Sequence, residues 1–170
     1  MKPSHGPSRF WRHLVTDHGS ARRAFPEAAL RRIGAAIAAG EKQHRGQVRF
    51  VVEPALPLAR VLKKLSPRER ALEVFGQLRI WDTEKNAGVL VFLLLADRDV
   101  EIVADRGIHQ QVGTPVWEAI CRKMEAAFRN GEFAAGVEAG IEAINALLAQ
   151  HFPGDGRTSE NELPDRPMIL

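Results

Sequence analysis

The sequence contains a single cysteine, Cys121, among its 170 residues. An intrachain disulfide is therefore impossible, which excludes the disulfide framework that stabilises many small secreted domains. The chain does not need one, because 45% of its residues are hydrophobic and a chain of this length can bury a sizeable core. These features favour one globular domain in a reducing compartment.

The sequence also lacks a long hydrophobic run. The longest apolar stretch, Ala87 to Ala96, is far shorter than the roughly 20 residues that a membrane-spanning helix requires. The opening residues, MKPSHGPSRFWRHL, show neither the apolar core nor the small-residue cleavage site of a secretory signal. We therefore expect a cytoplasmic protein whose contact with a membrane, where there is one, is peripheral.

Motifs of several common site classes are missing as well. The sequence has no GxSxG nucleophile elbow, no P-loop and no GxGxxG dinucleotide fingerprint. It has no zinc-ligand spacing and no aromatic RNA-binding pattern, so we expect no nucleic-acid partner. Cys121 falls within a predicted helix beside its apolar face, which indicates a buried small side chain rather than a nucleophile.

Positive charge is concentrated at the N-terminal end. Residues 1–49 contain ten Lys and Arg against three Asp and Glu, whereas the rest of the chain contains fourteen against eighteen. A basic segment of this kind suits an acidic membrane surface or an acidic partner, and a solvated helix face is the alternative. Residues 1–24 are predicted to be a loosely held basic arm, with Phe10, Trp11 and Leu14 packed on the surface of the domain.

Hydrophobic periodicity predicts a domain over residues 25–152 and a flexible C-terminal tail over residues 153–170. A strand–helix–strand unit followed by a hairpin predicts a three-layer α/β/α sandwich with a mixed central β-sheet. The segment Ser66-Pro67-Arg68-Glu69 has the residues of a helix start, with Ser66 and Glu69 as a capping box. The expected helices are at residues 25–40, 66–81, 114–130 and 132–148, and the expected strands are at 47–53, 88–96 and 100–104.

Oxygen-bearing side chains flank the two strands of the predicted hairpin. Asp82, Glu84 and Asn86 precede its first strand, and Asp105 follows its second strand. Because the start of one hairpin strand lies beside the end of the other, we expect these side chains at one rim of the sheet. They are candidate ligands of Ca²⁺ or Mg²⁺. The alternatives are a structural loop and, for Asp105, an Asx-type turn before Gly107.

His109 and Glu53 are also near predicted strand ends. His109 follows the predicted rim closely enough to act as an acid, a base or a metal ligand, and an exposed loop histidine is the alternative. Glu53 ends the first strand, which is expected to run parallel to the second. It is therefore predicted to lie at the opposite rim from Asp105.

Two segments of the sequence resemble the TPM domain family, also called the TPM-phosphatase or YgcG-like domain. They are RERALEVFGQLRIWDTEKNAGVLVFLLLADRDVEIVADRGI and FRNGEFAAGVEAGIEAINALL. The resemblance covers roughly Phe25 to Phe152. It rests on a helix ending in tryptophan, a DNGVLLL-like strand, an RxVxI-like strand and a helix pair containing Phe128, Gly131 and Gly136. It implies the same three-layer sandwich that the periodicity predicts.

The resemblance also implies candidate activities and partners. Some relatives are described as weak acid phosphatases or as binding calcium or other divalent ions, and many bacterial relatives accompany membrane proteins of the LemA type. This chain departs from the family pattern at Asn86-Ala87-Gly88, where an acidic oxygen is lost. It departs again at Val103 and Asp105, which stand at a usual acid and a usual glycine. The metal ligands of the family are therefore not carried over residue by residue.

Three functions are open at this point. The first is a non-enzymatic TPM-type binding domain, associated with LemA-like or other membrane partners or with an acidic membrane surface, and able to bind a divalent cation. The second is a weak divalent-metal-dependent acid phosphatase, with the metal at Asp82, Glu84, Asn86 and Asp105 and with His109 as proton carrier. The third is a scaffold that self-associates. The basic N-terminal third and the absence of a nucleophile favour the first.

Overall fold

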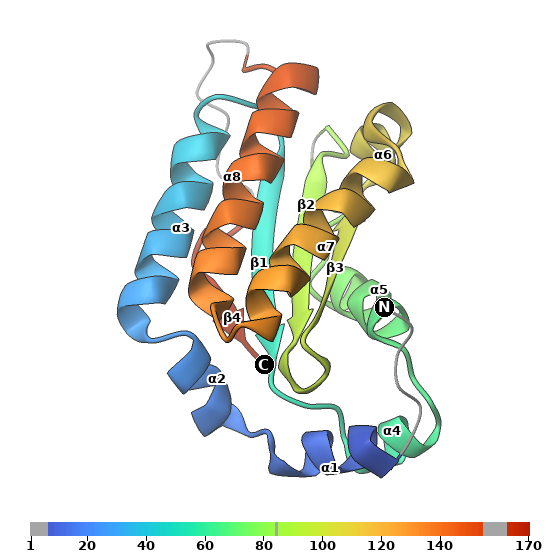
Figure 1. Cartoon of the computed structure of the whole chain (residues 1–170). Helices are drawn as coiled ribbons and strands as arrows, with labels where there is room; N and C mark the ends of the chain where they lie inside the picture. Colours follow the sequence, from blue (N-terminus) through green and yellow to red (C-terminus); the bar gives the residue numbers. More distant parts are fainter. Residues whose placement is uncertain (1–6, 84, 155–162) are drawn as a thin grey trace.

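The computed structural model describes residues 7–83, 85–154 and 163–170. Its centre is a four-stranded sheet of β1 (Gln47–Glu53), β2 (Gly88–Leu94), β3 (Asp99–Ala104) and β4 (Met168–Ile169) (Figure 1). The strand order is β3-β2-β1-β4. β1 runs parallel to β2 and to β4, whereas β2 and β3 are antiparallel, so the sheet is mixed.

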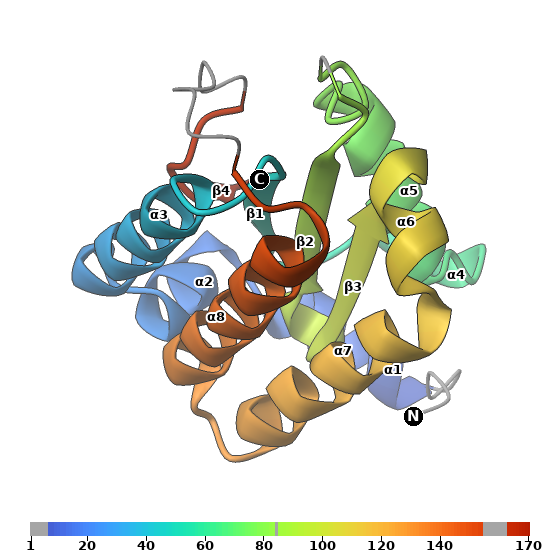
Figure 2. The same ribbon diagram turned by 90° about the horizontal axis from the view of Figure 1, so that it is seen from above.

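Helices cover both faces of this sheet (Figure 2). One face carries α3 (Glu27–Glu41), α7 (Thr114–Arg129) and α8 (Phe133–His151). The other carries α4 (Leu58–Leu62) and α5 (Pro67–Gln77). The predicted three-layer α/β/α sandwich with a mixed central sheet is therefore confirmed.

The central strand β2 is buried along its whole length. Val89, Val91 and Leu93 pack in the core under α3, α7 and α8, whereas alternate residues such as Leu90 and Phe92 pack on the side of α5. This alternation follows from the two-residue period of a strand. It explains why the β2 segment is apolar at every position, as expected for a strand covered on both faces.

Local signals explain where several elements begin and end. The predicted capping box is present, because Ser66 Oγ accepts a hydrogen bond from the Glu69 N–H at 3.1 Å and the Ser66 N–H donates to Glu69 Oε2 at 2.8 Å. α5 stops at Gln77 rather than near Trp81, and the chain then turns through Arg79, whose φ of 53° is left-handed.

The segment after β3 is a helix, α6 (Arg106–Val112), where the sequence indicated a loop. Gly107 lies in the first turn of this helix, where a Cβ would lie 2.8 Å from the carbonyl oxygen of Asn86. The glycine therefore permits a close approach between α6 and the loop before β2.

Residues 7–24 are not a loosely held arm, because they form α1 (Pro7–Val15) and α2 (His18–Ala24). Arg9 is only 2% exposed, and its Nε donates a hydrogen bond to Asp97 Oδ2 at 2.9 Å. Arg9 Nη2 also donates to the carbonyl oxygen of Leu65 at 2.9 Å. Asp97 lies in η1 (Leu95–Asp97), the short turn that joins β2 to β3, so this contact ties the N-terminal helix to the hairpin.

Two more side chains of α1 surround the Asp97 carboxylate. Arg12 Nη2 lies 3.1 Å from Oδ1, and His13 Nε2 lies 3.2 Å from the same oxygen. His13 Nδ1 accepts a hydrogen bond from the Leu56 N–H at 2.9 Å, which places the ring proton on Nε2, the nitrogen that faces Asp97. Burial acts to raise the pKa of Asp97, but its contacts with His13 and Arg9 hold that pKa well below its usual value.

The last eight residues are docked rather than flexible. Met168 and Ile169 pair with Val51 and Val52 as β4, and Leu163 is buried. Arg49 Nη1 donates hydrogen bonds to the carbonyl oxygens of Pro164 and Arg166. The prediction of a flexible tail is therefore wrong for residues 163–170, and residues 155–162 lie outside the described part of the chain.

Replacing Asp97 should destabilise the protein strongly. In Asp97→Asn the Arg9 guanidinium loses its buried counter-charge, which costs about 3 kcal/mol. Urea unfolding at pH 7 measures the loss. Because the folded pKa is depressed, the contribution of the carboxylate is fully present above pH ~4 and declines below it, so the difference between the two proteins should become smaller as the pH falls from about 4 to 2.

The matched control is Asp82→Asn, which alters an exposed carboxylate paired with Arg79 and should change stability by less than about 1 kcal/mol. Equal effects of the two substitutions would contradict the structural role of Asp97.

Gly88→Ala should also destabilise the fold, because a Cβ at Gly88 would lie 2.0 Å from the main-chain oxygen of Ile80. We expect a loss of about 3 kcal/mol, at the upper end of the usual range for overpacking. Gly76→Ala is the control, since no atom lies within 4 Å of a Cβ built there. Alanine in this helical position should raise stability by about 0.5 kcal/mol. Thermal unfolding of the two variants measures the contrast.

Candidate functional site

The β2–β3 hairpin brings two of the predicted ligand positions together. Val89 pairs with Ala104 in the antiparallel ladder, and the Asp105 N–H donates to the Gly88 carbonyl oxygen at 2.8 Å. The loop before β2 reaches the same place, since Asn86 contacts the first turn of α6 at Gly107. The predicted convergence at one rim is therefore confirmed for Asn86 and Asp105.

Asp105 is the residue at which α6 begins. Its Oδ1 accepts a hydrogen bond from the Arg106 N–H at 2.6 Å, so one carboxylate oxygen has a structural role. Its Oδ2 is buried and has no hydrogen-bond partner among the described residues. Buried polar atoms nearly always have a partner, so this oxygen is an exception among the described residues.

The other predicted ligands contribute less to the rim. Asp82 is exposed and accepts a hydrogen bond from Arg79 Nη2 at 2.7 Å. Asn86 is exposed, with a left-handed φ of 49°, and Glu84 lies outside the described residues. Over residues 7–83, 85–154 and 163–170, no three His, Cys, Asp or Glu side chains are grouped closely enough to hold a metal ion.

Glu53 ends β1 beside Leu94, at the opposite end of β2 from Asp105, as the parallel pairing predicted. Its carboxylate accepts two hydrogen bonds from Arg70, at 2.7 and 3.1 Å. This pair joins β1 to α5 and leaves Glu53 without a free oxygen for a site at the other rim.

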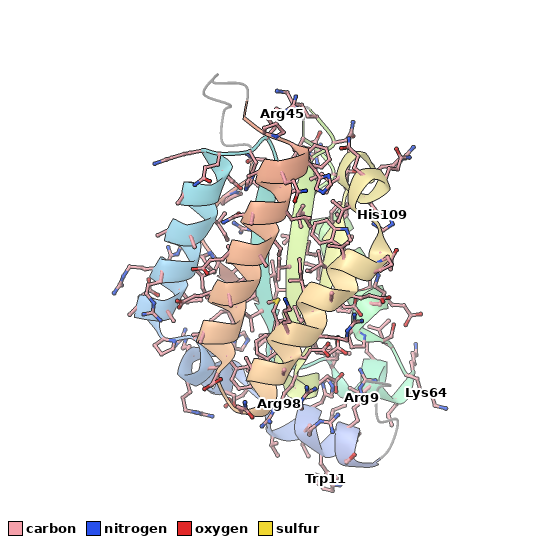
Figure 3. All side chains as sticks on the ribbon, turned by 45° about the horizontal axis from the view of Figure 1, so that its top comes forward. Arg9, Trp11, Arg45, Lys64, Arg98 and His109 are labelled. Atoms are coloured by element: carbon pink, nitrogen blue, oxygen red, sulfur yellow. The ribbon has the colours of Figure 1, made fainter. Side chains whose placement is uncertain are left out.

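A cleft of about 500 Å³ lies along the edge strand β3. Arg68 lines it from the start of α5, and Trp117 and Cys121 line it from α7. His109, labelled in Figure 3, is exposed on α6 and lines the same cleft. His109 therefore lies near the rim of Asp105, as the sequence predicted, since its N–H donates to the Asp105 carbonyl oxygen at 2.9 Å, and its side chain lines the β3 cleft.

Carboxylates dominate the chemistry of the β3 cleft. Burial raises the pKa of Asp99 to about 7, and the neighbouring carboxylates of Glu101, Glu125 and Asp97 act in the same direction. Burial also raises the pKa of Glu101, against the opposing effect of Arg68, whose Nη1 lies 3.2 Å from Glu101 Oε2. The cleft is thus a partly dry, acidic environment.

Cys121 lies in this cleft, but its environment does not activate it. Burial raises the pKa of the Cys121 thiol to about 12, and the nearby carboxylate of Glu101 raises it further. The thiolate is the nucleophilic form of cysteine, so the side chain is unreactive at neutral pH. This agrees with the interpretation of Cys121 from the sequence.

Sequence reasoning missed the β3 cleft, because Asp99 was assigned to a polar turn and α7 was analysed only for its apolar face. Two signals could have indicated it. Asp99 and Glu101 are two residues apart on a strand and so share a face. On α7, polar side chains recur at helical spacing opposite the apolar stripe, at Glu118, Arg122 and Glu125.

Figure 1 places α1 and α4 at one end of the molecule, and both helices carry exposed apolar side chains. We call this surface the α1–α4 patch, and it consists of Trp11, Leu14, Val15 and Leu62, each between 50% and 71% exposed. Figure 3 shows Trp11 pointing away from the body of the protein and Arg9 on the opposite side of α1. No helix of the described residues has the length and apolarity that crossing a membrane requires.

Comparisons with known proteins agree on the family. The family model of the TPM domain matches residues 21–147. The NMR structure of the BA42 protein from the psychrophilic bacterium Bizionia argentinensis is similar to this chain, with a TM-score of 0.74 and 26% identity. That match covers 84% of this chain and 93% of the other. No curated protein matches the sequence. Because the family model spans most of the sequence and the fold agrees, the chain belongs to the TPM domain family.

Proposed function

We propose that this TPM domain is a non-enzymatic binding domain that docks on an anionic membrane surface through the α1–α4 patch. The observation that carries the proposal is the exposure of Trp11, Val15 and Leu62 at one end of the molecule, beside the exposed Lys63 and Lys64. Apolar side chains with a basic surround are the composition of helices that lie in a membrane interface.

The apolar part of the patch includes the side chain of Trp11, which is 59% exposed. Tryptophan combines a broad apolar ring with one polar N–H, which suits it to the boundary between headgroups and acyl chains. Trp11 and Val15 lie four residues apart on α1 and therefore on the same helix face. Their exposure is a property of the fold, because the opposite face of α1 is occupied by Arg9 and His13 against Asp97.

The attachment of α1 to Asp97 also lowers the loss of conformational entropy on membrane binding. A segment that becomes ordered only at the membrane must lose conformational entropy when it binds. α1 is already helical, and its inner face is fixed by the Asp97 carboxylate. The outer face is thus presented in its bound form, and less of the interaction energy is spent on ordering.

Basic side chains supply the attraction to lipid headgroups. Lys63 and Lys64 follow Leu62 directly, and Arg22 and Arg23 are exposed on the neighbouring α2. Each Lys or Arg near an anionic bilayer contributes about 1 kcal/mol at physiological salt. The same orientation would bring the domain within reach of LemA-like or other membrane proteins, the partners that the family resemblance implies.

Flotation with vesicles tests the docking surface. The variant Trp11→Ser/Val15→Ser/Leu62→Ser should lose at least tenfold in affinity for vesicles containing 30% phosphatidylglycerol, because three side chains no longer bury apolar surface. Trp81→Ser is the matched control, since Trp81 is 48% exposed but belongs to the segment after α5. Lys63→Gln/Lys64→Gln should weaken binding about thirtyfold and reduce its salt dependence.

Point variants are more informative than deletion of residues 1–24. Such a deletion would also remove Arg9 and His13 and leave the Asp97 carboxylate buried without its partners. Equal binding of the triple variant and the wild type, or equal binding to neutral and anionic vesicles, would refute the membrane proposal.

A divalent cation at the rim of Asn86 and Asp105 is a second ligand that one observation favours. The buried Asp105 Oδ2 has no partner among the described residues, and carboxylate oxygens are the ligands that Ca²⁺ prefers. The geometry favours binding over the alternative of a metal-dependent acid phosphatase. Asp105 Oδ1 already accepts the Arg106 N–H at the start of α6, and the raised pKa of Cys121 keeps its side chain protonated.

Calorimetric titration with Ca²⁺ and Mg²⁺ tests this cation. Asp105→Asn keeps an oxygen for the Arg106 N–H but removes the charge, so it should weaken cation binding at least tenfold without unfolding α6. Asp82→Asn should leave the affinity within twofold, because Asp82 is already paired with Arg79. Heat that is unchanged in Asp105→Asn would remove Asp105 from the set of ligands.

A further inference from the structure

The β3 cleft carries two arginines that are already matched by acids. Arg68 Nη1 lies 3.2 Å from Glu101 Oε2 and donates a hydrogen bond to the Ile102 carbonyl oxygen at 2.7 Å. Arg122 Nη1 lies 3.7 Å from Glu118 Oε2, one helical turn away. These pairs account for two of the four carboxylates that line the cleft.

The other two carboxylates are Asp99 and Glu125. Among residues 7–83, 85–154 and 163–170, no basic side chain lies within ion-pair distance of either one. Burial raises the pKa of Asp99, and the nearby carboxylate of Glu125 acts in the same direction. Within the described part of the chain these two carboxylates therefore have no matching basic side chain, and a positively charged group that entered the cleft would gain from both of them.

Two buried atoms in the cleft residues have no hydrogen-bond partner within residues 7–83, 85–154 and 163–170. They are Asp99 Oδ1, an acceptor, and Trp117 Nε1, a donor. Trp117 is only 4% exposed, so its N–H has little access to bulk water. An acceptor and a donor left unpaired in one cleft indicate a ligand that carries groups of both kinds.

These requirements restrict the chemistry of the ligand. A bare metal ion cannot accept a hydrogen bond from an indole, and the described acids do not gather into a group that could hold a metal. An ammonium group donates three hydrogen bonds and carries a positive charge. Val100 and Ile102 supply apolar walls that suit a methylene chain. A carbonyl oxygen at the far end of such a chain would satisfy the indole.

We propose that the β3 cleft binds a lysine-like ligand, with its alkylammonium group against Asp99 and Glu125 and with a carbonyl oxygen accepting from Trp117 Nε1. The cleft lies along β3, whereas the α1–α4 patch lies on other elements, so this proposal does not depend on membrane docking. The ligand chemistry has two sources, a lysine within an extended segment of another protein and a free lysine derivative.

Nuclear magnetic resonance titration of the full chain at pH 8 tests the ligand chemistry, because Asp99, with a pKa of about 7, is mostly ionised there. The probe is N-acetyl-lysine N-methylamide, which should bind in the millimolar range and shift the Trp117 indole resonance. N-acetyl-norleucine N-methylamide has the same backbone without the charge and should bind at least tenfold more weakly. Pentane-1,5-diamine has the ammonium without the carbonyl and should leave the indole resonance in place.

A lysine-containing hexapeptide separates the two sources. An affinity at least tenfold above that of the single-residue probe identifies an extended segment as the ligand, and an equal or lower affinity identifies a free lysine derivative. Equal binding of the lysine and norleucine probes would overturn the proposal, as would shifts confined to residues outside the cleft.

Variants locate the binding site. Asp99→Asn and Glu125→Gln should each weaken the lysine probe at least fivefold, whereas Glu142→Gln, on the exposed surface of α8, should have no effect. Unchanged binding in both cleft variants would overturn the assignment.

Asp99→Asn should also fold normally and melt higher than the wild type at pH 8, by about 5 °C. The folded pKa of Asp99 is raised, so its ionised form destabilises the folded state as the pH rises from about 4 towards 7. The difference in melting temperature should therefore shrink as the pH falls below about 4, where Asp99 becomes protonated in the unfolded state as well as in the folded state. Loss of probe binding together with a higher melting temperature at pH 8 distinguishes a binding role from a folding defect.

Discussion

The buried carboxylate of Asp97 connects parts of this protein that are far apart in the sequence. It lies in the turn between β2 and β3 and contacts Arg9, Arg12 and His13 of α1. Its desolvation is offset only because three donors surround it, so the carboxylate and α1 are stable together and neither is stable alone. The hairpin supplies both the rim with Asp105 and the β3 cleft. The orientation of α1 supplies the exposed patch.

Opposite charges are placed on different surfaces. The end formed by α1, α2 and α4 carries exposed Lys63 and Lys64, whereas the β3 cleft carries carboxylates that have no basic partner among the described residues. Such a separation gives the molecule a preferred orientation in the field of an anionic surface, because the basic end is attracted and the acidic cleft is repelled. The net charge of +3 conceals this asymmetry.

Most of the fold could be predicted from the sequence because its signals are local. The uninterrupted apolar run of β2 indicated a strand covered on both faces, and Ser66 with Glu69 indicated the start of α5. The missed elements depend on distant contacts. Arg9 and His13 look like surface residues until Asp97, 88 positions from Arg9, is placed beside them. Gly107 looks like a helix breaker until Asn86 is placed against it.

The candidate sites could also be predicted where local signals decide the structure, and not where distant contacts do. The hairpin pattern was sufficient to predict that Asn86 and Asp105 share a rim. It was not sufficient to predict which oxygens are free, because Asp82 pairs with Arg79 and Asp105 begins a helix. The β3 cleft requires two helices and a strand to be assembled, and the spacing within any one of them does not indicate a cavity.

Both edges of the sheet are modified in ways that limit pairing with other chains. On one side the C-terminal residues Met168 and Ile169 pair with β1, and the Leu170 N–H donates to the Val52 carbonyl oxygen at 2.9 Å. On the other side Arg68 occupies the outward-facing carbonyl oxygen of Ile102. A sheet edge with free backbone groups is a template for runaway stacking of identical molecules. The C-terminal residues cover one edge of the sheet, and Arg68 interrupts the other. The sheet is therefore protected against fibre growth even at a high local concentration of the protein.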